Sequence, residues 1–293
     1  MATALSVSTR PRTALARIGG FLRLLHPFPS LLNAAVTVAL ACVAVRGRPP
    51  LADVGTLALA MLCIQCAIGA LNDWADRALD ARAKPEKPMP AGLVRPGLAL
   101  TAALALAAVA AVLAARFGLA AWALAMAGLG VGVAYDLGLK RTPLSALTYA
   151  VALPLLPVWV WTSLGRGSPA LVVVIPVGAL LGFGLQLANA LPDAEGDIAS
   201  GVRGTLQWLG PERGRRLAWA AFAGALALSA ALGALAGLHA LPFLPLWLVA
   251  VALFLAAVLV YRSSPSRRAL QVGWSLLAPA AALLAVGWLA SLP

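Results

Sequence analysis

Six of the ten acidic residues of this chain fall in two short windows, residues 72–80 and 189–197. Both windows follow the pattern Asn-x-x-x-Asp-x-x-x-Asp, with Asn72, Asp76 and Asp80 in the first and Asn189, Asp193 and Asp197 in the second. On a helix, residues four apart lie near the same face, so each window would present a row of oxygen ligands. Oxygen ligands without His or Cys favour Mg²⁺ over zinc or copper. The two windows therefore predict two related metal-binding motifs.

Basic residues accompany both acidic windows. Lys84 and Lys87 follow the first window, Arg203 follows the second, and Lys140-Arg141 lie between them in the sequence. Metal ligands beside Lys and Arg suit a polyphosphate, whose oxygens bridge the metal ions while the bases bind the remaining charge. At the edge of an apolar membrane interior, such a site suits an amphiphile with a diphosphate head and a hydrocarbon tail. Isoprenyl diphosphates are molecules of this kind.

The segments that carry these residues are very apolar. The chain has 62% hydrophobic and 11% charged residues and a mean hydropathy of +0.92, whereas a soluble domain has roughly a quarter charged residues. Ala and Leu dominate and no strand-like alternation occurs, which predicts helices rather than a barrel. We therefore predict an all-α polytopic membrane bundle of nine transmembrane helices, at approximately residues 24–45, 52–75, 97–115, 119–136, 143–163, 169–191, 214–237, 241–261 and 269–291.

The basic residues also predict the topology. The net charge of +12 is placed between apolar segments, which favours topology signals and lipid headgroup contacts over nucleic-acid binding. With a cytoplasmic N-terminus, 18 of the 22 Lys and Arg residues fall on that side. We therefore expect a multi-pass protein of the cell membrane with its C-terminus outside. Residues 1–16 are expected to form a disordered cytoplasmic tail, and residues 17–293 a single transmembrane domain.

Several smaller signals concern packing. Gly128-x-x-x-Gly132 and Gly178-x-x-x-Gly182 predict close contact between helices. Pro192 removes a helical hydrogen bond within the second window, which predicts a kink that helps to aim Asp193. His26 precedes a proline at the first segment and is interpreted as structural, with a headgroup or acceptor contact as the alternative.

These motifs resemble those of the UbiA superfamily of intramembrane prenyltransferases. Asn72-Asp73-x-x-Asp76-Arg77-x-x-Asp80, followed by Lys87-Pro88-Met89-Pro90-Ala91-Gly92, closely resembles the first signature of the family. Asp193-x-x-x-Asp197 with Gly201 and Arg203 resembles the second signature, and Tyr135 with Lys140-Arg141 resembles the basic loop after the fourth helix. Arg23 before His26-Pro27 resembles the entry to the first helix. The likeness extends over nearly the whole chain.

The resemblance implies a nine-helix bundle around a central cavity, two Mg²⁺ ions and transfer of an isoprenyl group from a prenyl diphosphate to an acceptor, which in this family is usually aromatic. The metal–diphosphate centre implied by the resemblance consists of Asn72, Asp76, Asp80, Asp193 and Asp197. The resemblance implies catalytic roles for Asp73, Tyr135, Lys140 and Arg141. It implies substrate-binding roles for Asn72, Lys84, Lys87, Asn189 and Arg203, and for Arg23 toward the acceptor. Tyr149, Trp159, Trp161 and Phe183 are candidates to stabilise an allylic cation through their ring faces, with ordinary packing as the alternative.

Two departures from the family pattern leave the acceptor open. The segment after Asp80 is two residues shorter than the common pattern for aromatic acids, and it has Lys where Arg is usual. Two alternative functions also remain. A terpene cyclase on the same scaffold would need no acceptor, and a cation-binding transporter would bind without releasing diphosphate.

Overall fold

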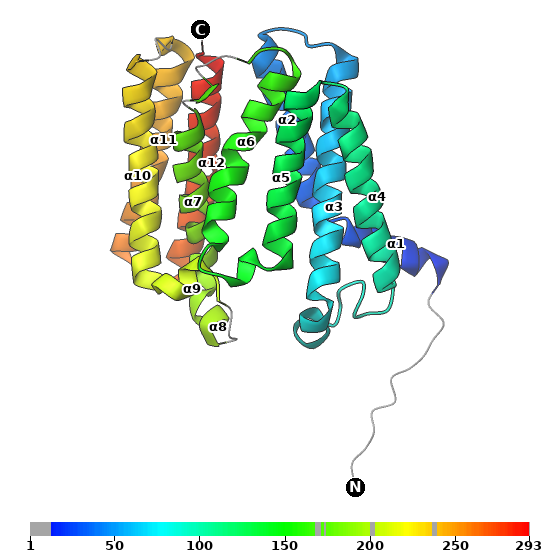
Figure 1. Cartoon of the computed structure of the whole chain (residues 1–293). Helices are drawn as coiled ribbons and strands as arrows, with labels where there is room; N and C mark the ends of the chain where they lie inside the picture. Colours follow the sequence, from blue (N-terminus) through cyan, green and yellow to red (C-terminus); the bar gives the residue numbers. More distant parts are fainter. Residues whose placement is uncertain (1–12, 168–170, 173, 200–202, 236–238, 293) are drawn as a thin grey trace.

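A computed structural model describes residues 13–167, 171–172, 174–199, 203–235 and 239–292, and the regular structure within these ranges is helical. Nine of the described helices are long and apolar enough to cross a membrane, which agrees with the predicted number. They form one bundle (Figure 1) and are α2 (Pro27–Val45), α3 (Leu51–Ala83), α4 (Pro96–Ala115), α5 (Leu119–Leu137), α6 (Ser145–Ser163), α7 (Val174–Ala190), α10 (Pro211–Leu235), α11 (Ala240–Ser263) and α12 (Arg267–Ala290). Four short elements, which lie at one end of the bundle, are η1 (Leu139–Arg141), η3 (Leu191–Asp193), α8 (Ala194–Ala199) and α9 (Thr205–Leu209). The predicted all-α membrane fold is confirmed.

The spanning helices pack mainly on their neighbours in the sequence, and α12 contacts both α7 and α2, so the bundle closes on itself. Glycines permit two of the closest contacts. A Cβ at Gly182 would collide with the backbone of Tyr149 on α6, and one at Gly132 would collide with Ile68 on α3. Gly128 instead has open space around it. The predicted close packing is therefore confirmed for three of the four glycines, because Gly178 also abuts Pro154 of α6.

The two acidic windows differ in backbone structure. Helix α3 continues without a break to Ala83, beyond the predicted end at residue 75, so the first window is fully helical. The second window is divided among three elements, with Asn189 in α7, Asp193 in η3 and Asp197 in α8. Pro192 lies in the 3-10 turn, as its missing N–H requires. The α-helix is thus interrupted at Pro192, where a kink was predicted, and a second continuous row of ligands on one helix is not formed.

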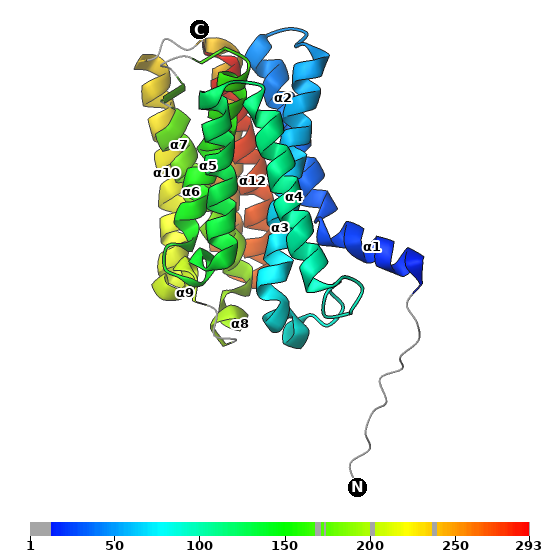
Figure 2. The same cartoon turned by 45° about the vertical axis from the view of Figure 1, so that its right-hand side comes forward.

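A further helix, α1 (Ala14–Leu24), precedes the bundle and was not predicted. It begins at Ala14, so the expected start of the folded domain at residue 17 lies inside it, and residues 1–12 are outside the described ranges. Helix α1 lies across the direction of the spanning helices (Figure 2). Leu15, Ile18 and Leu22 are exposed on it, while Leu24 is fully buried.

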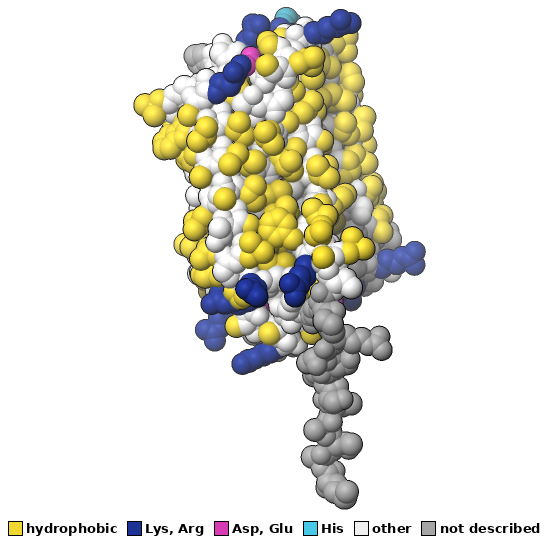
Figure 3. All heavy atoms as spheres, turned by 90° about the vertical axis from the view of Figure 1, so that its right-hand side faces the viewer, with side chains coloured by type: hydrophobic (Ala, Val, Ile, Leu, Met, Phe, Trp, Pro, Cys, Tyr) yellow, Lys and Arg dark blue, Asp and Glu magenta, His cyan; other side chains and the backbone are white. Residues whose placement is uncertain are grey.

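The surface of the bundle matches a multi-pass membrane protein. Hydrophobic side chains cover its middle, and Lys and Arg gather toward the two ends (Figure 3). Both acidic windows lie at the same end as α8 and α9. At the opposite end Arg116 donates a 2.9 Å hydrogen bond to Asp53. Which end faces the cytoplasm stays a prediction.

Candidate active site

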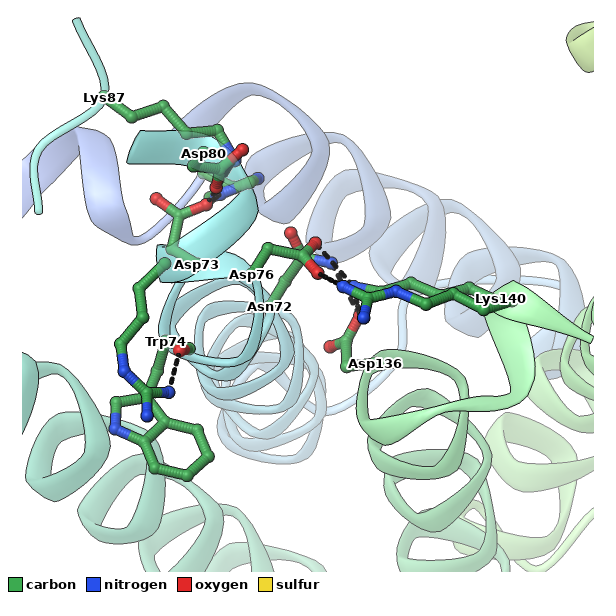
Figure 4. Close-up of polar contacts among 11 residues, drawn as sticks. Asn72, Asp73, Trp74, Asp76, Asp80, Lys87, Asp136 and Lys140 are labelled. Carbon is green, nitrogen blue, oxygen red and sulfur yellow. Dashed lines mark hydrogen bonds and ion pairs between the residues drawn. The ribbon is translucent and has the colours of Figure 1, made fainter. Parts of the chain in front are cut away.

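The last three turns of α3 carry two distinct acidic faces (Figure 4). The first face holds Asn72 and Asp76, which point toward α5 and the η1 turn. Asn72 donates a 2.7 Å hydrogen bond from its Nδ2 to Asp136 at the end of α5. Asp76 accepts hydrogen bonds from Lys140 Nζ at 2.6 Å and Arg141 Nη2 at 2.7 Å. This face therefore meets the basic turn that the sequence had placed between the two windows.

The second face holds Asp73 and Asp80, which share one lysine. Lys87 Nζ lies 2.9 Å from Asp73 Oδ1 and 2.7 Å from Asp80 Oδ2. A step of four residues ends about 40° past one full turn of a helix, whereas a step of seven ends only about 20° short of two full turns. Asp80 therefore lies closer to the face of Asp73 than to that of Asn72. The predicted single row of three ligands is divided between the two faces.

The network around Lys87 is buried. Asp73 is 3% exposed and Asp80 4% exposed, so neither charge is well hydrated. Burial lowers the pKa of Lys87, but hydrogen bonds to Asp80 and Asp73 raise it more, and the pKa lies above its usual value. Lys87 therefore stays positively charged at neutral pH and neutralises part of the buried negative charge.

The second window makes fewer contacts. Asp193 is exposed and forms an ion pair with Arg267 at the start of α12. Asp197 accepts a 3.2 Å hydrogen bond from Gln207 Nε2 on α9. Asn189 is exposed and has no polar side-chain contact with the rest of the described chain. The structure thus does not place Asn189 with the other predicted substrate-binding residues.

A chain of contacts links the two windows. Thr205 at the start of α9 donates from its Oγ1 to Pro143 O at 2.8 Å, and its N–H donates to Ser145 Oγ at 2.9 Å. These bonds hold α9, which carries Gln207, against the segment that directly follows η1, the turn with the bases bound to Asp76. Lys84 is near enough to Asp197 for their charges to interact. The two windows therefore lie at one end of the bundle, with basic residues between them.

Two predicted substrate-binding residues are not brought into this network. The side chains of Arg23 on α1 and Arg203 before α9 are exposed, and neither makes a polar contact within the described ranges. Gly201, which contributed to the resemblance, lies outside those ranges.

The structure also adds three residues: Asp136 and Arg267, which the sequence did not assign to the site, and His26, for which an acceptor contact was only the alternative. Asp136 is 3% exposed and orients Asn72. Its position directly after Tyr135 and four residues before Lys140 was a usable signal. His26 Nε2 lies 3.1 Å from Asp73 Oδ1. Arg267 pairs with Asp193 from 74 residues away, and no local spacing rule relates two such positions.

An apolar cavity of about 380 Å³ adjoins the first face. Tyr135 lines it directly before Asp136, and Ile68 lines it one turn before Asn72. The cavity thus extends from the polar cluster into the bundle, between α2, α3, α5 and α6, and its size is typical of a small-molecule site. Of the four aromatic candidates, Tyr149 and Trp159 line it. Trp161 and Phe183 pack in the apolar cores instead.

The donor atoms at this end of the bundle are of the type that Mg²⁺ prefers. Because Asn72 donates from its amide nitrogen to Asp136, its Oδ1 is left free to act as a ligand. Across the described ranges, no three His, Cys, Asp or Glu side chains are grouped closely enough to hold an ion in the present arrangement. Lys87, Lys140, Arg141 and Arg267 occupy the carboxylates instead. The chemistry of the donor set fits Mg²⁺, provided that bound metal replaces these bases.

Comparison with known proteins gives a consistent result. The sequence matches the model of the UbiA prenyltransferase family over residues 33–277. It is 30% identical to the digeranylgeranylglyceryl phosphate synthase of Natronomonas pharaonis over 195 residues. This alignment covers 64% of this chain and 68% of that protein. It is also 36% identical to the 4-hydroxybenzoate octaprenyltransferase of Ralstonia nicotianae over 105 residues. This alignment covers 35% of this chain and 36% of that protein.

Solved structures show the same fold. A digeranylgeranylglyceryl phosphate synthase superposes with a TM-score of 0.79 at 15% identity, covering 94% of this chain and 98% of that one. A UbiA homologue from Archaeoglobus fulgidus bound to GPP and Mg²⁺ superposes with a TM-score of 0.67 at 18% identity, covering 91% and 99%.

Proposed function

Because this chain belongs to the UbiA prenyltransferase family and transfers prenyl groups, we propose that its donor is a prenyl diphosphate and its cofactor Mg²⁺. The observation that carries the proposal is that the first acidic window and the bases bound to it lie beside the polar end of an apolar cavity, with the second window at the same end of the bundle. The homologue from A. fulgidus, which binds GPP or DMAPP together with Mg²⁺, supports the same donor and metal.

The donor fits the site with its hydrocarbon tail in the cavity and its diphosphate at the polar end. Lys87, Lys140 and Arg141 now bond to carboxylates. When Mg²⁺ binds those carboxylates, the same bases become free to bind diphosphate oxygens, and short charge-assisted hydrogen bonds of this type are strong. Lys84 and Arg203 are the further candidates for this role. Arg23 and Asn189 are the weakest members of the proposed set, because neither has a polar contact in the described chain.

Asn72, Asp76, Asp80, Asp193 and Asp197 are the proposed metal ligands. Mg²⁺ bound by them would neutralise negative charge that develops on the departing diphosphate. The chain's own bases add fixed positive charge at the same place, and such preorganised charge accelerates the breaking of the C–O bond.

The allylic cation that remains needs a dry and electron-rich environment. The cavity is lined mainly by apolar side chains, which exclude water that would otherwise capture the cation. Tyr149 and Trp159 present aromatic rings to the cavity, and the face of such a ring attracts a cation. We assign them to stabilisation of the intermediate, and Tyr135 to the polar end beside Asp136.

Two classes of acceptor are candidates. An aromatic acceptor is the primary proposal, and a relative named for 4-hydroxybenzoate supports it. The longer match, to a digeranylgeranylglyceryl phosphate synthase, favours the hydroxyl of a prenylated glyceryl phosphate as the second candidate. Both react as nucleophiles with the carbon that loses diphosphate.

The test uses purified protein in lipid nanodiscs with GPP or DMAPP, with and without Mg²⁺, and with each acceptor class. Mass spectrometry identifies the prenylated product, and a coupled assay measures diphosphate release. We expect product only with donor, acceptor and Mg²⁺, and loss of product with EDTA. A cyclised hydrocarbon formed without acceptor would indicate a terpene cyclase. Binding of donor without diphosphate release would indicate a transporter or binding protein.

A further inference from the structure

His26 is held in an unusual conformation at the junction of α1 and α2. Its backbone is left-handed, with φ 48° and ψ 61°, a region that residues with a Cβ seldom adopt. The ring packs on α3 at Gly69, where an added Cβ would lie 3.1 Å from the Cβ, Cγ and Cδ2 atoms of His26. One turn further along α3, Asp73 Oδ1 lies 3.1 Å from Nε2. Two residues of one helix therefore fix the orientation of this imidazole.

The contacts also define which ring nitrogen is free. Asp73 is bonded to Lys87 at 2.9 Å, and a carboxylate can only accept hydrogen bonds, so Nε2 of the neutral ring carries the proton. The other nitrogen, Nδ1, then has the lone pair. Because the Cδ2–Nε2 edge faces Gly69 and Asp73, Nδ1 lies on the opposite edge of the ring, away from α3.

The imidazole lies beside the polar end of the cavity, because it packs on Gly69, which directly follows the cavity-lining Ile68 on α3. The side chain of His26 is 34% exposed, although its partner Asp73 is buried. Pro29 and Asn33, which follow on α2 within two turns, both line the cavity. Asp136, at the polar end of the cavity, is near enough to interact with His26 electrostatically. The charged groups around the imidazole are therefore Asp73 on α3, Lys87 in the loop after it and Asp136 on α5.

We propose that His26 is the general base that removes the proton from the acceptor, with Asp73 as the positioning residue that holds the ring. The proposal rests on the proposed function, since it assumes an acceptor that loses a proton. The C–O bond of the prenyl diphosphate breaks, and its electron pair leaves with the diphosphate. The nucleophilic atom of the acceptor forms the new bond to the prenyl carbon. The proton of the acceptor passes to Nδ1, and the imidazolium beside Asp73 later releases it to water.

A general base of this kind contributes about 10²- to 10⁴-fold to a rate. The rival explanation is that His26 only fixes the angle between α1 and α2. The two roles differ in what a substitution changes, because a base acts on transfer to the acceptor, whereas a structural residue acts on folding and on binding of both substrates.

The experiment compares His26→Asn and His26→Gly with the wild type. Asn and Gly both tolerate a left-handed backbone, and neither supplies a base at the position of Nδ1. The assay measures prenylated 4-hydroxybenzoate, or prenylated glyceryl phosphate, and total diphosphate release from GPP. We expect transfer to fall about 10²-fold or more, with KM for GPP and binding of GPP little changed. Added imidazole should restore part of the transfer in His26→Gly.

Three outcomes decide the matter. Near-normal transfer in both variants, or no response to imidazole, would overturn the role of His26 while leaving the proposed function intact. A wild type that forms no product with either acceptor would overturn the proposed function and this inference with it. If neither variant folds, Asp73→Asn decides, because loss of the carboxylate that holds the ring should lower transfer while GPP binding persists, and unchanged transfer would overturn the role of His26.

Discussion

Asn72 on α3 and Asp136 on α5 are joined by a 2.7 Å hydrogen bond from the amide nitrogen to the carboxylate. The bond engages the amide nitrogen and leaves Asn72 Oδ1 free as a ligand atom, so Asp136 holds a proposed metal ligand in place. Residues in this position typically change metal affinity or activity by about 10- to 100-fold when they are lost. We expect Asp136→Leu to lower turnover by that amount and to raise the Mg²⁺ concentration needed for half-maximal activity.

Asp136→Asn is the matched control for this prediction, because it retains an oxygen that can accept from Asn72. It should lose less activity than the leucine variant. Asp53→Asn, which changes a carboxylate at the other end of the bundle, should leave the Mg²⁺ titration unchanged. An unaltered Mg²⁺ requirement in Asp136→Leu would show that this carboxylate does not orient a ligand.

The second prediction concerns Lys87 and stability. Replacing it with Met leaves two buried carboxylates, Asp73 and Asp80, without their shared cation. Removing one partner of a buried ion pair typically costs about 3–5 kcal/mol. We expect a clear drop in the thermal unfolding temperature of purified Lys87→Met. Adding Asp73→Asn and Asp80→Asn to this variant should recover part of the loss, and failure to recover it would mean that charge is not its cause.

The raised pKa of Lys87 determines how this loss varies with pH. A lysine whose folded pKa lies above its unfolded value contributes stability that is fully present below the unfolded pKa, and the contribution is lost as pH rises through the folded pKa. The difference in unfolding temperature between the wild type and Lys87→Met should therefore be constant from about pH 6 to 9. A difference that already shrinks near pH 8 would contradict the raised pKa.

The third prediction concerns topology, and we test it by cysteine labelling in a variant that lacks Cys42, Cys63 and Cys66. Glu86 and Glu195 are exposed near the two windows, and Arg48 is exposed at the opposite end. Single cysteines at positions 86 and 195 should react with a membrane-impermeant reagent only from the cytoplasmic side, and a cysteine at position 48 only from outside. Labelling of 86 and 195 from opposite sides would rule out a common site.

Apolar length and charge placement sufficed to predict the nine spanning helices, because each helix must cover the hydrocarbon core by itself. The positions of the motifs likewise predicted that both acidic windows lie at one end of the bundle, as they do. The basic residues that pair with the acidic side chains were harder to predict from the sequence. Arg77 lies within the first window, yet it stacks on Trp74 with 4.6 Å between the guanidinium carbon and the ring centre.

Two physical reasons explain these differences. The pattern of every fourth residue drifts around the helix, so Asp80 rotates away from Asn72 toward Asp73 and shares its lysine. Long-range pairs such as Arg267 with Asp193 depend on how α12 closes the bundle, which is a property of tertiary packing. Helix α1 was missed because its short apolar face, with Leu15, Ile18 and Leu22, is too brief to resemble a spanning segment.

The last prediction tests whether the two windows serve one centre. Asp76 and Asp193 occupy corresponding places in the two motifs, and basic and hydrogen-bonded residues lie between the two windows. If both hold metal at one diphosphate, removing either carboxylate leaves the leaving group poorly neutralised. Asp76→Asn and Asp193→Asn should each lower turnover by about 10²-fold or more, the scale of losing one preorganised electrostatic contact.

The double variant distinguishes one centre from two. Groups that act as a unit are strongly non-additive, so Asp76→Asn combined with Asp193→Asn should be little slower than either single variant. Folding should persist in all three, because each substitution replaces a carboxylate with an uncharged amide of the same shape. The measurement is turnover with saturating GPP and Mg²⁺, with Asp53→Asn as the control for a carboxylate outside the site. Fully multiplicative losses would mean that the two windows act independently, and near-normal turnover in either single variant would remove that window from the reaction.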